Sequence, residues 1–158
     1  MTKNIWITGA SSGIGKALAI KFAKEGWQVA ASARRVNLLD DLNKNNPNIH
    51  SFPLDVVDPK NTLNTFQSIL EKLNNIDLCI FSTGTYDPKK EREINLEQIR
   101  TTINVNFFGT LNCIKVVEKY FKDKKNGHIS IISSVAGYRG LPNSTGYGPS
   151  KAALTNLA

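Results

Sequence analysis

Three glycines, Gly9, Gly13 and Gly15, lie in one short turn between an apolar run over residues 3–8 and an amphipathic stretch over residues 16–24. This order predicts a buried strand, a tight turn and a helix. Gly9 permits the turn, Gly13 lets the backbone approach a pyrophosphate, and Gly15 lets the helix pack closely. The first N–H groups of a helix are free, so the turn predicts an anion site. A glycine-rich connection that binds no ligand is the alternative.

The rest of the chain repeats the pattern of short apolar runs followed by longer amphipathic stretches. This pattern predicts βα units around a parallel sheet, with strands that are buried on both faces. The expected strands cover residues 3–8, 28–32, 49–53, 76–81 and 128–133. The expected helices cover residues 13–25, 36–45, 59–73 and 96–121, and another begins near Tyr147.

Length and composition indicate one soluble domain over residues 1–158. The hydrophobic fraction of 41% in 158 residues supports one continuous core but not two. The longest apolar runs are too short to cross a bilayer, so we expect no membrane partner and a cytoplasmic location. Cys79 and Cys113 lie in apolar segments without metal-ligand spacing, which favours buried, reduced thiols and no metal site.

The net charge of +7 could attract nucleic acid or a phosphate-bearing ligand. The basic residues are scattered, however, and no helix with clustered Arg and Lys is evident, so we expect no nucleic-acid partner. We interpret Lys122, Lys124 and Lys125 as a solvated helix end. Residues 89–93 mix Lys and Arg with Glu91 and are interpreted as an exposed loop of mixed charge.

The end of the second strand indicates which dinucleotide would bind. A protein that prefers NAD(H) usually has Asp or Glu here to bind the ribose 2′-OH. This chain has Ala33 at that position, followed by Arg34 and Arg35. A guanidinium can bind a 2′-phosphate through two parallel hydrogen bonds, so NADP(H) is favoured and NAD(H) is less favoured. The alternative is that both arginines are solvated loop charges.

A tyrosine and a lysine four residues apart form the candidate catalytic pair. On a helix, Tyr147 and Lys151 would project from one face. An ordinary tyrosine has a pKa of about 10, too high for an efficient acid or base at neutral pH, and a nearby cation favours the phenolate. Lys151 could supply that cation. On its own the pair is weak evidence, because such pairs are common on helix surfaces.

Together these motifs resemble the short-chain dehydrogenase/reductase family, NADP-preferring type, from residue 8 to residue 151. The glycine spacing TGxxxGxG is the family's variant. Ser134 lies thirteen positions before Tyr147, as in the family, which implies that it holds the substrate oxygen. Asn106 matches the Asn that interrupts helix packing and anchors a water for proton relay. Taken singly, Ser134 could be a cap and Asn106 a polar helix residue.

Two further segments carry the resemblance. Asp55 and Val56 resemble the family's adenine contact, although Asp55 could equally be a turn or cap residue. Where the family commonly has NNAG, this chain has Phe-Ser-Thr-Gly over residues 81–84. Gly84 keeps the close approach to the cofactor, and Ser82 is expected to replace the missing Asn in part. The implied cofactor contacts are Gly9, Ser11, Ser12, Gly13, Ile14, Gly15, Arg34, Arg35, Asp55, Val56, Gly84, Tyr147 and Lys151.

The resemblance implies an α/β fold: a Rossmann-type doubly wound parallel sheet with five of the usual seven strands, in the order 3-2-1-4-5. It also implies NADP(H)-dependent exchange of a carbonyl for an alcohol on a small-molecule substrate, with Tyr147 as general acid/base, and a homo-oligomer, dimer or tetramer. The family's later strands and substrate lid are absent, so the chain is interpreted as C-terminally truncated. A non-catalytic dinucleotide-binding fragment or a redox-sensing regulator is the alternative.

Overall fold

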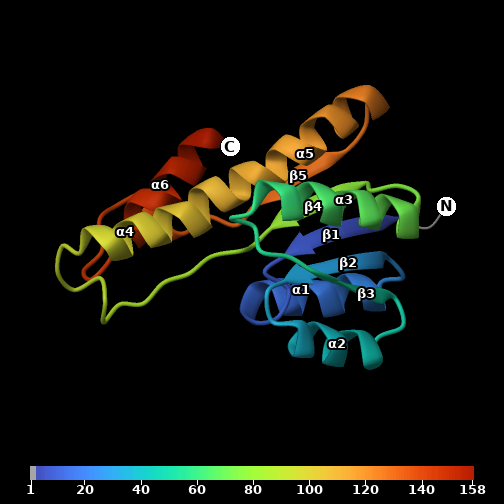
Figure 1. Ribbon diagram of the computed structural model, residues 1–158, viewed down its shortest axis with the longest axis horizontal. Coiled ribbons are helices and arrows are strands. Elements are labelled where there is room, and N and C mark those ends of the chain that lie inside the picture. Colours follow the sequence, from blue (N-terminus) through green and yellow to red (C-terminus); the bar gives the residue numbers. More distant parts are fainter. Residues whose placement is uncertain (1–2) are drawn as a thin grey trace.

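The computed structural model describes residues 3–158 and shows a five-stranded sheet in the order β3-β2-β1-β4-β5 (Figure 1). The strands are β1 (Asn4–Thr8), β2 (Gln28–Ala33), β3 (Ile49–Pro53), β4 (Leu78–Phe81) and β5 (His128–Ile131). All four pairings between neighbouring strands are parallel. The predicted Rossmann-type sheet and its strand order are therefore confirmed.

Six α-helices connect or follow the strands: α1 (Gly13–Lys24), α2 (Val36–Lys44), α3 (Pro59–Leu73), α4 (Leu96–Ile103), α5 (Gly109–Lys124) and α6 (Tyr147–Leu157). Helices α1 and α2 cover one face of the sheet, and α3 and α5 cover the other (Figure 1). Among residues 3–158, no helix combines the length and the apolar character needed for a bilayer span.

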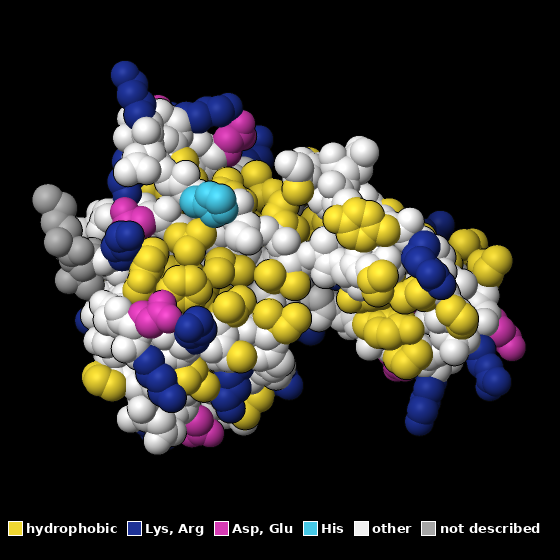
Figure 2. Space-filling model, turned by 180° about the vertical axis from the view of Figure 1, so that it is seen from behind, with side chains coloured by type: hydrophobic (Ala, Val, Ile, Leu, Met, Phe, Trp, Pro, Cys, Tyr) yellow, Lys and Arg dark blue, Asp and Glu magenta, His cyan; other side chains and the backbone are white. Residues whose placement is uncertain are grey.

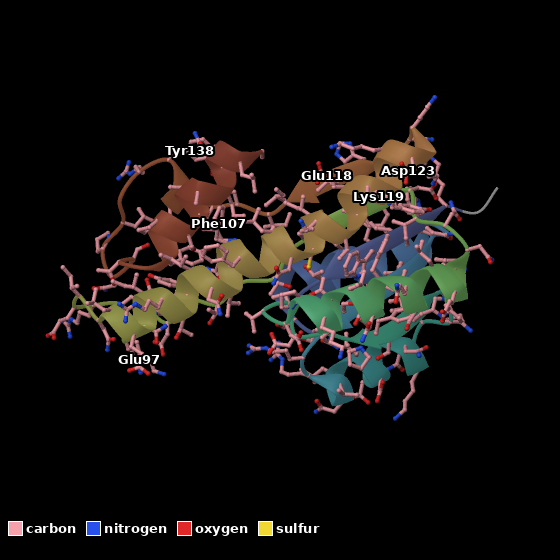
Figure 3. The ribbon with its side chains drawn as sticks, turned by 45° about the horizontal axis from the view of Figure 1, so that its top comes forward. Glu97, Phe107, Glu118, Lys119, Asp123 and Tyr138 are labelled. Carbon is pink, nitrogen blue, oxygen red and sulfur yellow. The ribbon has the colours of Figure 1, made fainter. Side chains whose placement is uncertain are left out.

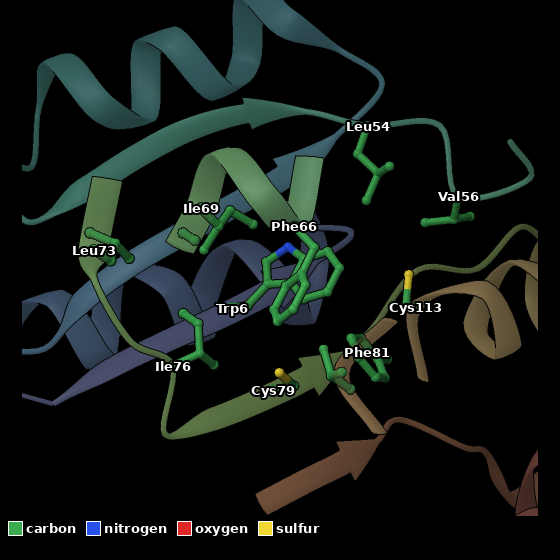
Figure 4. Close-up of a cluster of buried hydrophobic side chains, with 12 residues drawn as sticks. Trp6, Leu54, Val56, Phe66, Ile69, Leu73, Ile76, Cys79, Phe81 and Cys113 are labelled. Atoms are coloured by element: carbon green, nitrogen blue, oxygen red, sulfur yellow. The ribbon is translucent and has the colours of Figure 1, made fainter. Parts of the chain in front are cut away.

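A hydrophobic cluster lies on each face of the sheet, and strand β1 supplies side chains to both clusters. Ile5 and Ile7 pack toward α1 and α2, whereas Trp6 packs toward α3 and α5. The Trp6 ring stacks on Phe66 at a centroid distance of 5.5 Å and meets the edge of Phe81 at 5.6 Å (Figure 4). Its indole N–H donates to the Ser32 hydroxyl at 2.9 Å, so this buried polar group is satisfied. The central strand is thus fixed from both sides.

The parallel register aligns the carboxyl ends of the strands. Thr8, the last residue of β1, lies beside Ser32 on one side and Phe81 on the other, and Phe81 lies beside Ile131. The loops that follow these strands therefore meet at one edge. In open α/β sheets this edge is where ligands bind.

The helix predicted over residues 96–121 is interrupted. Between α4 and α5, residues Asn104–Phe108 form one turn of π-helix, and α5 continues to Lys124. Figure 3 shows the three segments as one rod, with the exposed charged side chains of Glu97, Glu118, Lys119 and Asp123 along it. Such π turns are rare and are frequent at functional sites.

Three expectations about the ends of elements differ from the structure. Strand β4 begins at Leu78, because the amide of Ile76 donates to the Tyr120 hydroxyl at 3.1 Å and not to a neighbouring strand. Lys124 is not a solvated helix end: its ammonium lies 2.9 Å from a carboxylate oxygen of Asp77 and donates to the Ile76 carbonyl at 2.7 Å. Strand β5 also ends two residues early, at Ile131.

Candidate functional site

A cavity opens at the carboxyl edge of the sheet, lined by residues that follow all five strands. Every predicted cofactor contact except Gly15 lines it: Gly9, Ser11, Ser12, Gly13, Ile14, Arg34, Arg35, Asp55, Val56, Gly84, Tyr147 and Lys151. The structure therefore brings together segments that lie up to 142 positions apart in the sequence. The sequence-based prediction that these residues surround one ligand site agrees with this arrangement.

The glycines of the first turn have different surroundings. Gly9 has φ +70°, and a Cβ there would lie 2.8 Å from the Ser82 carbonyl oxygen. A Cβ on Gly15 would overlap the Gly9 carbonyl group. Gly13 has φ +55° with open space around it. Gly9 and Gly15 thus permit close packing, and Gly13 leaves room at the cavity for a ligand.

The start of α1 suits an anion. Within the described chain, the first turn of α1 has no acidic side chain, and the Ser12 side chain does not cap it. The first N–H groups of the helix are then left for another acceptor, and the helix dipole adds positive potential there. These features fit the pyrophosphate of a dinucleotide.

Both arginines after β2 are exposed and line the cavity. The guanidinium of Arg35 donates to the Ser11 hydroxyl at 2.9 Å and to the Ser12 hydroxyl at 2.6 Å. Arg35 is therefore held beside the glycine turn and does not extend freely into solvent. A 2′-phosphate in the cavity would meet positive charge and two hydroxyl groups at this point.

Asp55 forms a turn at the cavity. Its carboxylate accepts from the amide of Val57 at 3.3 Å, and its own amide donates to the Asn61 side chain at 2.9 Å. The turn-residue alternative is therefore present in the structure. Because Asp55 and Val56 also line the cavity, a role beside the adenine stays compatible with this geometry.

The loop after β4 departs from the family pattern at Ser82. No hydrogen bond of the Ser82 side chain is found among residues 3–158. The adjoining strands are linked instead by the Thr83 amide, which donates to the Thr8 hydroxyl at 3.4 Å. A Cβ on Gly84 would lie 3.6 Å from the Asn106 side-chain oxygen and 3.7 Å from the Lys151 ammonium.

Tyr147 and Lys151 lie one turn apart at the start of α6, and both line the cavity. The Lys151 nitrogen is 5.7 Å from the centre of the Tyr147 ring and donates to the Ile132 carbonyl at 2.7 Å. Lys151 is only 4% exposed, and burial lowers the pKa of its ammonium below the ordinary value. The predicted pairing on one helix face is confirmed.

Asn106 lies in the π turn and is fully buried. Its side-chain oxygen accepts from the Thr85 amide at 2.7 Å, while its side-chain nitrogen donates to the Thr85 carbonyl and to the Ser150 hydroxyl, each at 3.0 Å. Asn106 thus connects the loop after β4 with α6. It does not itself line the cavity, although its neighbour Val105 does.

Ser134 precedes the short 3-10 turn η2 (Val135–Gly137), and its hydroxyl oxygen accepts from the Ala136 amide at 3.2 Å. Ser134 therefore does cap this turn, which was the alternative interpretation of this residue. Ser134 does not itself line the cavity, although its neighbour Ser133 does. Because a capping hydroxyl still has its own proton to donate, this position does not conflict with holding a substrate oxygen.

Two residues of the site were missed by sequence reasoning. The ring of Tyr86 stacks on that of Tyr147 at a centroid distance of 4.5 Å, and its hydroxyl donates to the Asn143 carbonyl at 3.1 Å. Glu91 is fully buried, so the expectation of an exposed mixed-charge loop was wrong at this position. A single glutamate in a charged run gives no sequence signal of burial.

Comparison with known proteins identifies the family of this chain. A family model for the short chain dehydrogenases matches residues 3–158. The chain belongs to the short-chain dehydrogenase family. A dehydrogenase/reductase SDR family member 7 from Mus musculus is 32% identical over 95% of this chain and 47% of the relative. A 3-oxoacyl-(acyl-carrier-protein) reductase from Thermotoga maritima is 32% identical over 96% of this chain and 63% of the relative.

The solved structure of ElxO with NADP bound is also similar, with a TM-score of 0.89 at 29% sequence identity, over 99% of this chain and 65% of that chain. The chain thus spans about half to two thirds of the length of the proteins it matches.

Proposed function

We propose that this chain carries the cofactor-binding and catalytic residues of an NADP(H)-dependent oxidoreductase that interconverts a carbonyl and an alcohol. The observation that carries the proposal is that Tyr147 and Lys151 line the same cavity as the glycine turn and the two arginines. Family membership and an NADP-bound structural neighbour support it. When bound, the nicotinamide would donate or accept the hydride.

The protein's own residues would handle the proton and the orientation of the substrate. Tyr147 exchanges a proton with the substrate oxygen, and Ser134 donates a hydrogen bond to that oxygen. Lys151 places a cation beside the phenol and binds the nicotinamide ribose. Asn106 fixes the loop after β4 against α6 and holds a water that connects Lys151 with solvent.

The preference for NADP(H) over NAD(H) rests on charge at the end of β2. Ala33 lines the cavity where a carboxylate would repel a 2′-phosphate, and Arg34 and Arg35 follow it. Arg35 also donates to two hydroxyls of the glycine turn, and this position at the cavity supports a role in binding the phosphate. A cytoplasmic location and a homo-oligomeric assembly stay predictions.

Replacing Tyr147 with Phe tests the catalytic part of the proposal. The change removes only the phenolic oxygen, so carbonyl-dependent NADPH oxidation should be lost while NADPH binding, followed by nicotinamide fluorescence, is retained. Tyr138→Phe is the control, because Tyr138 is 79% exposed and lies outside the cavity lining. Full turnover in Tyr147→Phe would overturn the assignment.

The same assay separates the two alternatives. Turnover of any carbonyl or alcohol by the unchanged chain favours the enzyme. Tight NADPH binding without turnover of a broad carbonyl panel favours a non-catalytic dinucleotide-binding or redox-sensing protein.

A further inference from the structure

Glu91 is a fully buried carboxylate in the segment between β4 and α4. One of its side-chain oxygens accepts from the amides of Gly146 at 3.0 Å and Tyr147 at 2.8 Å. The other accepts from the Thr102 hydroxyl at 3.0 Å. The carboxylate therefore joins α4 directly to the backbone of the candidate catalytic tyrosine.

The contacts explain how a buried carboxylate can be tolerated. Isolated buried charge is strongly unfavourable unless it is hydrogen-bonded or paired. Here three donors surround the carboxylate, and two of them are amides at the N-terminus of α6, where the helix dipole stabilises negative charge. The amides of the first helical turn have no acceptor within the helix, so Glu91 also supplies the cap that α6 needs.

The same segment holds the chain before α6 at two further points. The Thr145 hydroxyl donates to the Glu91 carbonyl at 3.3 Å, and the Tyr86 hydroxyl donates to the Asn143 carbonyl at 3.1 Å. Tyr147 is the first residue of α6, so the direction of its side chain depends on how this helix begins. A shift at the start of α6 would move the phenol relative to the cavity without touching the glycine turn.

We propose that Glu91 is a positioning residue: its carboxylate fixes the first turn of α6 and thereby sets the placement of the Tyr147 phenol for proton transfer. This inference rests on the proposed function for its catalytic consequence. Its structural part, the anchoring of the Gly146 and Tyr147 amides, stands on the contacts themselves.

Two conservative variants separate the effect of the Glu91 side-chain length from the effect of its charge. Glu91→Asp keeps the charge but shortens the side chain by one carbon, so its carboxylate cannot contact the α6 amides and Thr102 together. Glu91→Gln keeps the length and one acceptor oxygen for the two amides, and its new NH₂ group can donate to the Thr102 hydroxyl. Glu93→Asp is the matched control, because Glu93 is exposed two positions further along.

Steady-state kinetics give the first readout. Glu91→Asp is expected to lower kcat about 10- to 100-fold, because small misplacements of a catalytic group have effects of this size. Its Kd for NADPH should stay within about twofold of the unchanged chain, since Glu91 does not line the cavity and contacts Tyr147 only through the backbone amide. Glu91→Gln should keep kcat within about threefold, the range expected when a neutral acceptor replaces a charged one. Unchanged kcat in Glu91→Asp, or an equal loss in Glu91→Gln, would overturn the proposal.

Amide hydrogen exchange gives a second readout that needs no turnover. In the unchanged chain and in Glu91→Gln and Glu93→Asp, the amides of Gly146 and Tyr147 should be protected. In Glu91→Asp their exchange should accelerate about tenfold or more while the amides of β1 stay protected. Retained protection in Glu91→Asp would refute the anchor. If the unchanged chain shows no turnover, the catalytic proposal fails, and the exchange result still decides whether Glu91 anchors α6.

Discussion

Arg35 and Lys151 are two cations of one cavity that are held in different ways. Arg35 is exposed and donates to the hydroxyls of Ser11 and Ser12. Lys151 is buried, and burial lowers the pKa of its ammonium. A guanidinium stays charged at any relevant pH and suits a phosphate. A lysine with a lowered pKa releases its proton more easily, which suits a position beside a group that exchanges a proton.

The two cysteines should be inert in the folded chain. Burial raises the pKa of Cys113 to about 12, and burial together with the neighbouring Cys113 raises the pKa of Cys79 well above its ordinary value. Because the thiolate is the reactive form, a water-soluble thiol reagent at about pH 8 should label neither residue until guanidinium unfolds the chain. Rapid labelling of either thiol in the native chain would contradict this expectation.

The ionised carboxylate of Asp77 should stabilise the fold, and this stabilisation should be lost at acid pH. Burial alone would raise the pKa of this carboxyl group, but the Asn4 amide and the Lys124 ammonium outweigh burial and hold the pKa below its ordinary value of 3.8. The folded pKa lies below the unfolded one, so the stabilisation is fully present above the unfolded value and is lost as pH falls through the folded value. Asp77→Asn should lower the free energy of unfolding by about 1 kcal/mol at neutral pH.

Denaturant unfolding of the chain and of Asp77→Asn at pH 7 and at about pH 3 checks this linkage. The difference between the two proteins should shrink at the lower pH. An equal difference at both values would show that the charge of Asp77 has no part in the effect.

At the scale of elements, the turn between β1 and α1 offers a matched pair of substitutions. Gly13 and Gly26 both have positive φ, +55° and +85°, with open space where a Cβ would lie, but only Gly13 lines the cavity. Gly13→Ala and Gly26→Ala should each cost about 1–2 kcal/mol of stability, because alanine is strained in this conformation. NADPH affinity should fall in Gly13→Ala alone. Equal NADPH affinity in the two variants would mean that the cofactor does not bind at Gly13.

Local sequence signals predicted most of the elements, because the strands are short segments rich in apolar residues and the turn glycines mark where α1 begins. The π turn at Asn104–Phe108 was missed because the apolar periodicity of α4 runs into that of α5. The burial of Glu91 could not be predicted either. It depends on amides 55 and 56 positions away, and no local pattern records such a contact.

At the scale of the whole molecule, strand β5 has one side without a neighbouring strand among the described residues. Within residues 3–158, β5 pairs with β4 alone and is an edge strand. Val135 and Tyr138, which follow β5, are 62% and 79% exposed. Figure 2 shows that hydrophobic side chains gather on the face of the molecule opposite to that seen in Figure 1.

The central claim is that the cavity at the carboxyl edge binds NADP(H) and recognises its 2′-phosphate. Calorimetric titration of the chain with NADPH, and separately with NADH, tests it most directly. The account predicts NADPH binding at least about tenfold tighter than NADH binding, because a charge-assisted phosphate contact contributes more than about 1.4 kcal/mol. Binding of NADH as tight as that of NADPH, or binding of neither, would contradict it.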